Sequence, residues 1–164
     1  MAKPVYHDII KRQIIYMETS KKEYPQKEER AEASGKRGLG TVMILEDERP
    51  LLEVVQLKLE GNGFDVITAR SVAQAVDFLT HMEHIDAVWV DHYLLGTEDG
   101  IGFVALLKEH PAWRLLPVFV VSNADEEDTR KDYLAFGVDK YYVKADTRLD
   151  DIVADLKRIV GEKR

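Results

Sequence analysis

Residues 85–100 read IDAVWVDHYLLGTEDG, an apolar run that ends abruptly at an acidic residue. The segment from Ile85 to Val90 is rich in β-branched and aromatic residues, and turn-forming residues follow Asp91 before the next helical pattern begins. Such a run is typical of a strand that is buried on both faces of a parallel sheet. In open α/β sheets, ligands bind at the carboxyl ends of the strands. Asp91 is therefore the first candidate for a reacting side chain.

The same alternation of an apolar run and a helical pattern extends along most of the chain. The apolar runs predict five strands, at residues 41–45, 64–68, 85–90, 118–121 and 138–143. Helical spacing predicts five helices, at residues 50–61, 72–79, 100–109 and 125–136 and from about residue 149 onward. Ser71 is expected to cap the second helix. The fourth helix is the least apolar, since only Tyr133, Leu134 and Phe136 are available to hold it against the sheet.

Strands and helices that alternate with short connections predict a doubly wound parallel α/β sheet with helices on both faces. For five strands we expect the flavodoxin-like order 2-1-3-4-5, in which the first and third strands are neighbours. Glu46 and Asp47, which follow the first strand, would then lie beside Asp91. The ends of the fourth and fifth strands would bring Ser122 and Lys144 to the same edge of the sheet.

The composition is that of an ordinary globular chain of 164 residues, of which 45% are apolar and 32% charged. There is no cysteine, which excludes disulfides and thiolate zinc sites. Residues 41–164 hold 14 Lys/Arg against 24 Asp/Glu, which argues against a broad face for nucleic acid. The longest apolar run near the N-terminus, residues 14–17, is too short for a signal peptide or a membrane span. We therefore expect a cytoplasmic protein that binds neither nucleic acid nor membrane.

Residues 1–40 differ from the remainder, with 9 Lys/Arg against 6 Asp/Glu. Apolar positions between Val5 and Met17 predict a short helix, and the polar residues 20–40, which include proline and glycines, predict a flexible linker. We therefore place the folded domain at residues 41–164. Two interpretations of the N-terminal extension stay open. It is either a disordered tail, with Met43 as an alternative start of the domain, or a docking or dimerising helix.

Three carboxylates at one sheet edge repel one another, and they need either raised pKa values or a cation. Mg²⁺ is the simplest cation, because it prefers oxygen ligands and leaves positions for water and a phosphoryl oxygen. With a metal in place, Asp91 would act as a nucleophile on phosphorus, because the ion screens the charge of the incoming phosphoryl group. Lys144 would pair with the resulting acyl phosphate, and Ser122 would donate a hydrogen bond to it.

These residues together resemble the receiver domain of two-component response regulators, the CheY-like fold. The resemblance covers about residues 41–161, and its motifs are Glu46 with Asp47, Asp91, Ser122 and Lys144, at the ends of strands one, three, four and five. It implies that Asp91 is the phosphoacceptor. It also implies that Mg²⁺ is bound by Glu46, Asp47, Asp91 and the backbone carbonyl of Tyr93.

The same resemblance implies a phosphorylation-controlled switch. Ser122 would move toward the phosphoryl group, Lys144 would pair with it, and Tyr141 would rotate between exposed and buried positions. The phosphoryl donor would be a sensor histidine kinase or a phosphotransfer protein. Output would pass through the face of the fourth helix, fifth strand and last helix, to a downstream protein partner or into a homodimer. Because the chain ends soon after the last helix, we expect a stand-alone regulator and not an enzyme, with self-dephosphorylation as its only reaction.

Two other functions stay open. The chain carries Leu95, Asn123 and Ala145 where the family usually has proline, a small residue and proline, so a receiver-like interaction module that is not phosphorylated is one alternative. A haloacid-dehalogenase-type phosphatase also uses a strand-end aspartate and Mg²⁺. That chemistry places a second aspartate two residues after the nucleophile, where this chain has Tyr93, so it is the weaker alternative.

Taken singly, several of these residues have simpler interpretations. Asp47 or Glu48 would cap the helix that follows the first strand. Tyr141 would be an ordinary half-buried tyrosine of the fifth strand. Asp91 alone would be a loop carboxylate, and only its combination with the other residues at matching strand ends favours a phosphoacceptor site.

Overall fold

The computed structural model describes residues 38–82, 84–94 and 99–162. Within these residues, five strands alternate with five helices. The elements are β1 (Thr41–Leu45), α3 (Arg49–Gly61), β2 (Asp65–Ala69), α4 (Val72–His81), β3 (Ala87–Val90), α5 (Gly100–Glu109), β4 (Val118–Ser122), α6 (Glu127–Ala135), β5 (Lys140–Val143) and α7 (Leu149–Glu162). The helix and linker predicted for residues 1–40 lie outside the described residues, except for residues 38–40. The division at residue 41 therefore stays a prediction.

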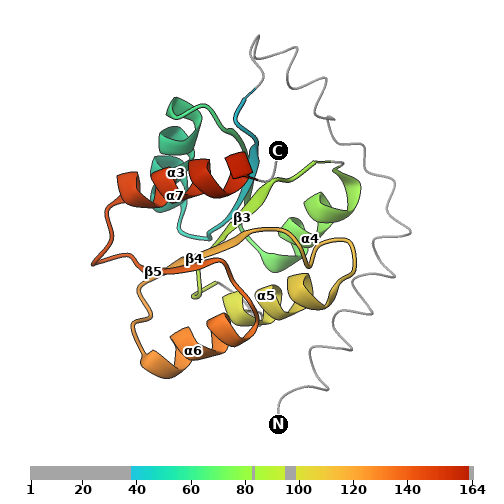
Figure 1. Ribbon diagram of the computed structural model, residues 1–164, viewed down its shortest axis with the longest axis vertical. Coiled ribbons are helices and arrows are strands. Elements are labelled where there is room, and N and C mark those ends of the chain that lie inside the picture. Colours follow the sequence, from blue (N-terminus) through green and yellow to red (C-terminus); the bar gives the residue numbers. More distant parts are fainter. Residues whose placement is uncertain (1–37, 83, 95–98, 163–164) are drawn as a thin grey trace.

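The five strands form one parallel sheet in the order β2-β1-β3-β4-β5, which confirms the predicted fold class. Every residue of the three central strands is buried, whereas the edge strands β2 and β5 include partly exposed positions. Figure 1 shows α3 and α7 together on one face of the sheet and α4, α5 and α6 on the other. Covering both faces explains the uninterrupted apolar sequence of β3.

An apolar core lies on each face of the sheet. Trp89 and Phe119 pack in the core beneath α3 and α7, while Met43 and Phe103 pack in the core beneath α4 and α5. Fully burying a large apolar side chain contributes about 1.5–3 kcal/mol, so these two cores supply most of the force that holds the strand ends in place. The strands thereby present a fixed row of carboxyl ends at one edge.

The strands β3 and β5 each begin two residues later than the sequence pattern predicts, and β2 begins one residue later. Asp86 precedes β3, and its carboxylate accepts a hydrogen bond of 2.7 Å from the amide of Thr41. Asp139 precedes β5, and its carboxylate accepts one of 2.8 Å from the amide of Val118. These side chains serve the first amide of the neighbouring strand, so the regular ladder starts only after them.

The helix ends show which capping predictions hold. Ser71 caps α4, since its hydroxyl accepts a hydrogen bond from the amide of Gln74. Glu48 occupies the N-cap position of α3 but makes no side-chain cap bond, so the capping interpretation of Glu48 is wrong. Of the three apolar residues expected to hold α6, only Tyr133 is buried; Leu134 and Phe136 are exposed. No helix in the described part of the chain is long and apolar enough to cross a membrane.

Candidate functional site

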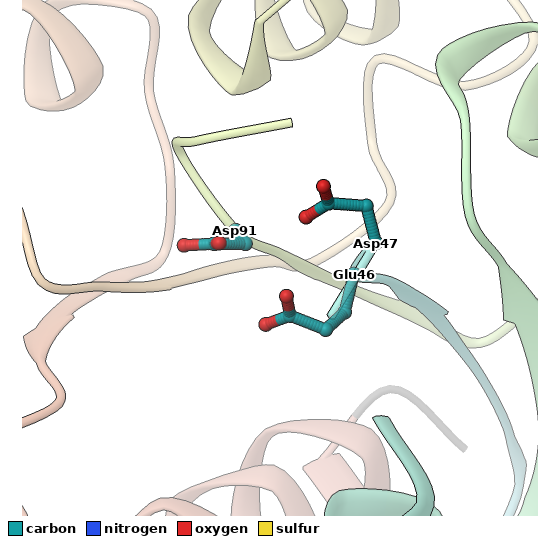
Figure 2. Close-up of side chains that lie close together, drawn as sticks. All are labelled: Glu46, Asp47 and Asp91. Carbon is teal, nitrogen blue, oxygen red and sulfur yellow. The ribbon is translucent and has the colours of Figure 1, made fainter. Parts of the chain in front are cut away.

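Three carboxylates meet where β1 and β3 end. Leu45 and Val90 are paired across these strands, and the amide of Asp91 donates a hydrogen bond of 3.0 Å to the carbonyl of Leu45. Glu46 and Asp47, which directly follow β1, therefore lie beside Asp91. Carboxylate oxygens of all three residues lie within 4.8 Å of one another, and Figure 2 shows the side chains gathered at this sheet edge.

Two of these carboxylates are buried. Glu46 is 1% exposed and Asp91 5% exposed, whereas Asp47 is partly exposed. Burial raises the pKa of Glu46, and the charge of Asp91 raises it further, against the opposing effect of the hydrogen bond from Lys144. The carboxylate of Glu46 also accepts a hydrogen bond of 3.1 Å from the amide of Glu48. The site thus holds more negative charge than its surroundings easily accommodate.

Lys144 supplies a positive charge from the end of the edge strand β5. It directly follows β5, and its amide donates to the carbonyl of Ser122, which fixes it to the end of β4. The ammonium Nζ lies 2.9 Å from Glu46 Oε2 and 3.3 Å from Asp91 Oδ1. One ammonium therefore faces two buried carboxylates with a third close by. Four of the five residues predicted from the strand ends are thus brought together: Glu46, Asp47, Asp91 and Lys144.

The donor set fits Mg²⁺. All three side chains offer carboxylate oxygens, the ligand type that this ion prefers. Two oxygens on opposite sides of an octahedral Mg²⁺ are about 4.2 Å apart, so ligands spread over 4.8 Å need only small side-chain adjustments. Glu46, Asp47 and Asp91 would hold the ion. The participation of the Tyr93 carbonyl stays a prediction.

Ser122 and Tyr141 form a second group centred on Ala124. Ser122 is the last residue of β4 and is fully buried, and its hydroxyl accepts a hydrogen bond of 3.2 Å from the amide of Ala124. The hydroxyl of Tyr141 donates a hydrogen bond of 2.5 Å to the carbonyl of the same residue. Tyr141 is 8% exposed, so it is more deeply buried than the simple strand interpretation predicts, and burial raises its pKa.

One residue of the site was not predicted from the sequence. The amide of His92 donates a hydrogen bond of 2.8 Å to Asp91 Oδ1. Its imidazole Nδ1 lies 2.8 Å from the hydroxyl of Tyr133 on α6. The only sequence signal for this residue is its position directly after Asp91.

Of the departures from the family pattern, Leu95 lies outside the described residues, and the Lys144–Ala145 peptide bond is trans.

Comparison with known proteins agrees with this geometry. The response regulator receiver domain family matches residues 42–157. The phosphate regulon transcriptional regulatory protein PhoB of Klebsiella pneumoniae is 32% identical over 119 residues, which cover 73% of this chain and 51% of PhoB. A response regulator from Thermotoga maritima has a solved structure with a TM-score of 0.63 and 29% identity, covering 74% of this chain and 98% of that one. The receiver domain of the Francisella response regulator 1452 has the same fold, with a TM-score of 0.69 and 20% identity, covering 76% of this chain and 99% of that one.

The chain therefore belongs to the response regulator receiver domain family. Receiver domains are signalling modules that bind Mg²⁺ in an acidic pocket and interact with histidine kinases or phosphotransfer proteins and with downstream partners. The sequence-based identification of the family is confirmed. The chain spans about half the length of PhoB, so nothing that the remainder of PhoB does transfers to it.

Proposed function

We propose that this chain is a receiver that is phosphorylated on Asp91 by a histidine kinase or a phosphotransfer protein, with Mg²⁺ as cofactor. The observation that carries the proposal is the buried carboxylate of Asp91, which lies close to the carboxylates of Glu46 and Asp47 and 3.3 Å from the ammonium of Lys144 at the carboxyl edge of the sheet. A structural aspartate has no need of two further carboxylates at this distance. A phosphoacceptor does, because the group that it receives must be bound together with a cation.

The reaction transfers a phosphoryl group from a histidine nitrogen of the donor to a carboxylate oxygen of Asp91. The P–N bond breaks, a P–O bond forms, and the donor imidazole leaves as a neutral ring after taking up a proton. Bound Mg²⁺ would screen the negative charge that gathers between the two groups. The amide of His92 and the ammonium of Lys144 both contact Asp91 Oδ1, so they orient the carboxylate before attack.

Phosphorylation would then change the hydrogen bonds around Ala124. A phosphoryl group on Asp91 brings new acceptor oxygens toward Lys144 and the buried hydroxyl of Ser122. If Ser122 turns to donate to them, the amide of Ala124 loses its present acceptor. The carbonyl of Ala124 holds the hydroxyl of Tyr141, so a shift of this residue would release or redirect that ring. This sequence of contacts supports the predicted roles of Ser122 and Tyr141 as the switch.

Output would use the face formed by α6, β5 and α7, toward a downstream protein partner or a second copy of the chain. Leu134 and Phe136 are exposed at the end of α6, 50% and 38% respectively, and offer apolar contacts to such a partner. In this proposal the domain acts through binding and not through catalysis, apart from loss of its own phosphoryl group. The stand-alone organisation expected from the sequence stays a prediction.

The proposal is tested by intact-protein mass spectrometry after incubation with acetyl phosphate, with and without Mg²⁺. We expect the wild type to gain one phosphoryl group only with the metal. Asp91→Asn should gain none, and Asp128→Asn, which changes an exposed aspartate on α6, should behave as the wild type. No gain with acetyl phosphate or with a histidine-phosphorylated donor would refute the proposal and favour the interaction module that is not phosphorylated.

A further inference from the structure

A single buried side chain anchors α6. Among the nine residues of this helix, only Tyr133 is buried, and it is fully so. Leu134 beside it is 50% exposed, and the N-cap residue Glu126 makes no side-chain cap bond. The position of α6 on the sheet therefore depends on what surrounds the ring and the hydroxyl of Tyr133.

The hydroxyl of Tyr133 reaches the segment that carries the phosphoacceptor. It lies 2.8 Å from the imidazole Nδ1 of His92. A Cβ atom placed on Gly100, the first residue of α5, would lie only 2.7 Å from this hydroxyl and 2.3 Å from the carbonyl oxygen of Asp91. The missing side chain at Gly100 thus leaves the space through which Tyr133 reaches His92. Figure 1 shows α6 next to α5 on this face of the sheet.

His92 contacts the phosphoacceptor through its backbone and α6 through its side chain. Its amide donates a hydrogen bond of 2.8 Å to Asp91 Oδ1, and its carbonyl accepts a hydrogen bond of 3.0 Å from the amide of Gly100. Its ring packs edge-on against the ring of Tyr133, with centroids 5.7 Å apart. Any change in the charge or orientation of the Asp91 carboxylate therefore acts on His92, whose side chain is hydrogen-bonded to Tyr133 of α6.

We infer that the hydrogen bond between His92 and Tyr133 is a positioning link that couples Asp91 to α6. The part of this inference that concerns phosphorylation rests on the proposed function. A phosphoryl group on Asp91 alters the acceptor of the His92 amide, the imidazole follows its backbone, and α6 follows the imidazole because no other side chain of that helix is buried. The link is separate from the hydrogen bonds at Ala124, although the rings of Tyr133 and Tyr141 touch, with centroids 5.4 Å apart.

The test is hydrogen–deuterium exchange of the α6 amides in the full chain, before and after treatment with acetyl phosphate and Mg²⁺. Tyr133→Phe keeps the buried ring and removes only the hydroxyl. In the resting protein we expect α6 amides to exchange roughly fivefold faster, as for the loss of one net hydrogen bond. In the wild type, phosphorylation should change α6 exchange. In Tyr133→Phe this change should be lost, while the gain in mass stays that of the wild type.

Three further variants separate the link from a general packing effect. His92→Leu should reproduce the effect of Tyr133→Phe, and the double variant should add nothing more, because both remove one shared bond. His92→Asn places a polar atom close to the position of Nδ1 and should restore part of the protection. Tyr142→Phe is the control. It removes a hydroxyl on β5 that donates to Asp155 and should leave the exchange rates of the α6 amides unchanged.

The outcomes distinguish this inference from the proposed function. The link would be overturned if the α6 amides of unphosphorylated Tyr133→Phe exchanged at the wild-type rate. It would also be overturned if phosphorylation changed α6 exchange in Tyr133→Phe as much as in the wild type. Additive effects of His92→Leu and Tyr133→Phe would do the same. If the wild type gains no phosphoryl group, the proposed function fails, and the resting exchange rates and the double variant still decide whether the link exists.

Discussion

Replacing Lys144 with methionine should strongly destabilise the protein, because this lysine balances two buried carboxylates. Its ammonium lies 2.9 Å from Glu46 Oε2 and 3.3 Å from Asp91 Oδ1. The side chain of Lys144 is 17% exposed, that of Glu46 2% and that of Asp91 7%. Methionine keeps an unbranched apolar chain of similar length and removes the charge. Glu46 and Asp91 would then repel each other without this counterion.

The size of the effect follows from the geometry. At an effective dielectric constant of about 20, each of the two contacts has a gross attraction of about 5 kcal/mol. Dehydration of the ammonium offsets most of this attraction, and removing one partner of a buried pair costs about 3–5 kcal/mol. Because Lys144 keeps 17% of its exposure, we expect the lower end, about 3 kcal/mol at pH 7 without metal. Mg²⁺ should restore part of this loss, since it replaces positive charge among the same carboxylates.

Urea unfolding in EDTA and in Mg²⁺ measures both quantities. A loss of 3 kcal/mol lowers the midpoint by about 1.5 M for a domain of this size. The matched control is Lys140→Met on β5, the strand that Lys144 follows, since Lys140 is 39% exposed and its ammonium lies 3.5 Å from Asp155. Breaking such an exposed pair costs about 0–1 kcal/mol. Equal midpoints for the two variants in EDTA would refute the reasoning, as would a Lys144→Met loss that Mg²⁺ leaves unchanged.

Four further predictions concern metal binding, the pH dependence set by Glu46, the lifetime of the phosphoryl group and the protonation of His110. Mg²⁺ at about ten times its dissociation constant should raise the wild-type unfolding free energy by about 1.4 kcal/mol, and thermal unfolding of Glu46→Gln should show little of this gain. In EDTA the same variant should be more stable than the wild type at neutral pH, because burial raises the pKa of Glu46, and the difference should vanish below about pH 4.5, where the glutamate is protonated in both folded and unfolded chains. If the exposed ring of Tyr93 shields the acyl phosphate from water, Tyr93→Ala should lose its phosphoryl group several-fold faster in a mass-spectrometric time course; an unchanged rate contradicts this. His110 stacks on Trp113 with ring centroids 3.8 Å apart, and burial lowers its pKa, so its contribution to stability should be complete above about pH 6.5 and lost as the pH falls through the lowered pKa. A fluorescence titration of Trp113 should follow this protonation, and His110→Gln should abolish it.

The fold and the acidic cluster could be predicted because both depend on repeated, local patterns. The strands β1 and β3 are uninterrupted apolar runs, and each is followed at once by acidic residues. Once the strand order is fixed, the register Leu45 opposite Val90 leaves little freedom in where Glu46 and Asp91 lie. Lys144 follows from the same reasoning, because it directly succeeds the last strand.

The contacts of α6 could not be predicted in this way. His92 and Tyr133 are 41 residues apart, and their hydrogen bond requires a particular side-chain direction at each end and an absent side chain at Gly100. Helical periodicity also misleads here. Neighbouring residues on a helix point about 100° apart, so when Tyr133 turns toward the sheet, Leu134 turns toward solvent. With a single inward-facing residue, a short helix has no apolar stripe to recognise.

The electrostatics of the site would connect the proposed Mg²⁺ to the proposed switch. Lys144 already contacts Glu46 and Asp91, so the phosphoryl group that we propose for Asp91 would compete with Glu46 for the same ammonium. Glu46 is buried and its pKa is raised, and losing Lys144 would leave its charge without its nearest counterion. A proton or a cation must then take the place of the ammonium. At neutral pH, Glu46 would hold a divalent cation at lower cost than a proton, and Lys144 would then be available to the phosphoryl group. On the proposed function, the sharing of one lysine between two buried carboxylates would make phosphorylation depend on Mg²⁺, and weakening that sharing by Glu46→Gln should make the pairing of Lys144 with a phosphoryl group less dependent on the metal.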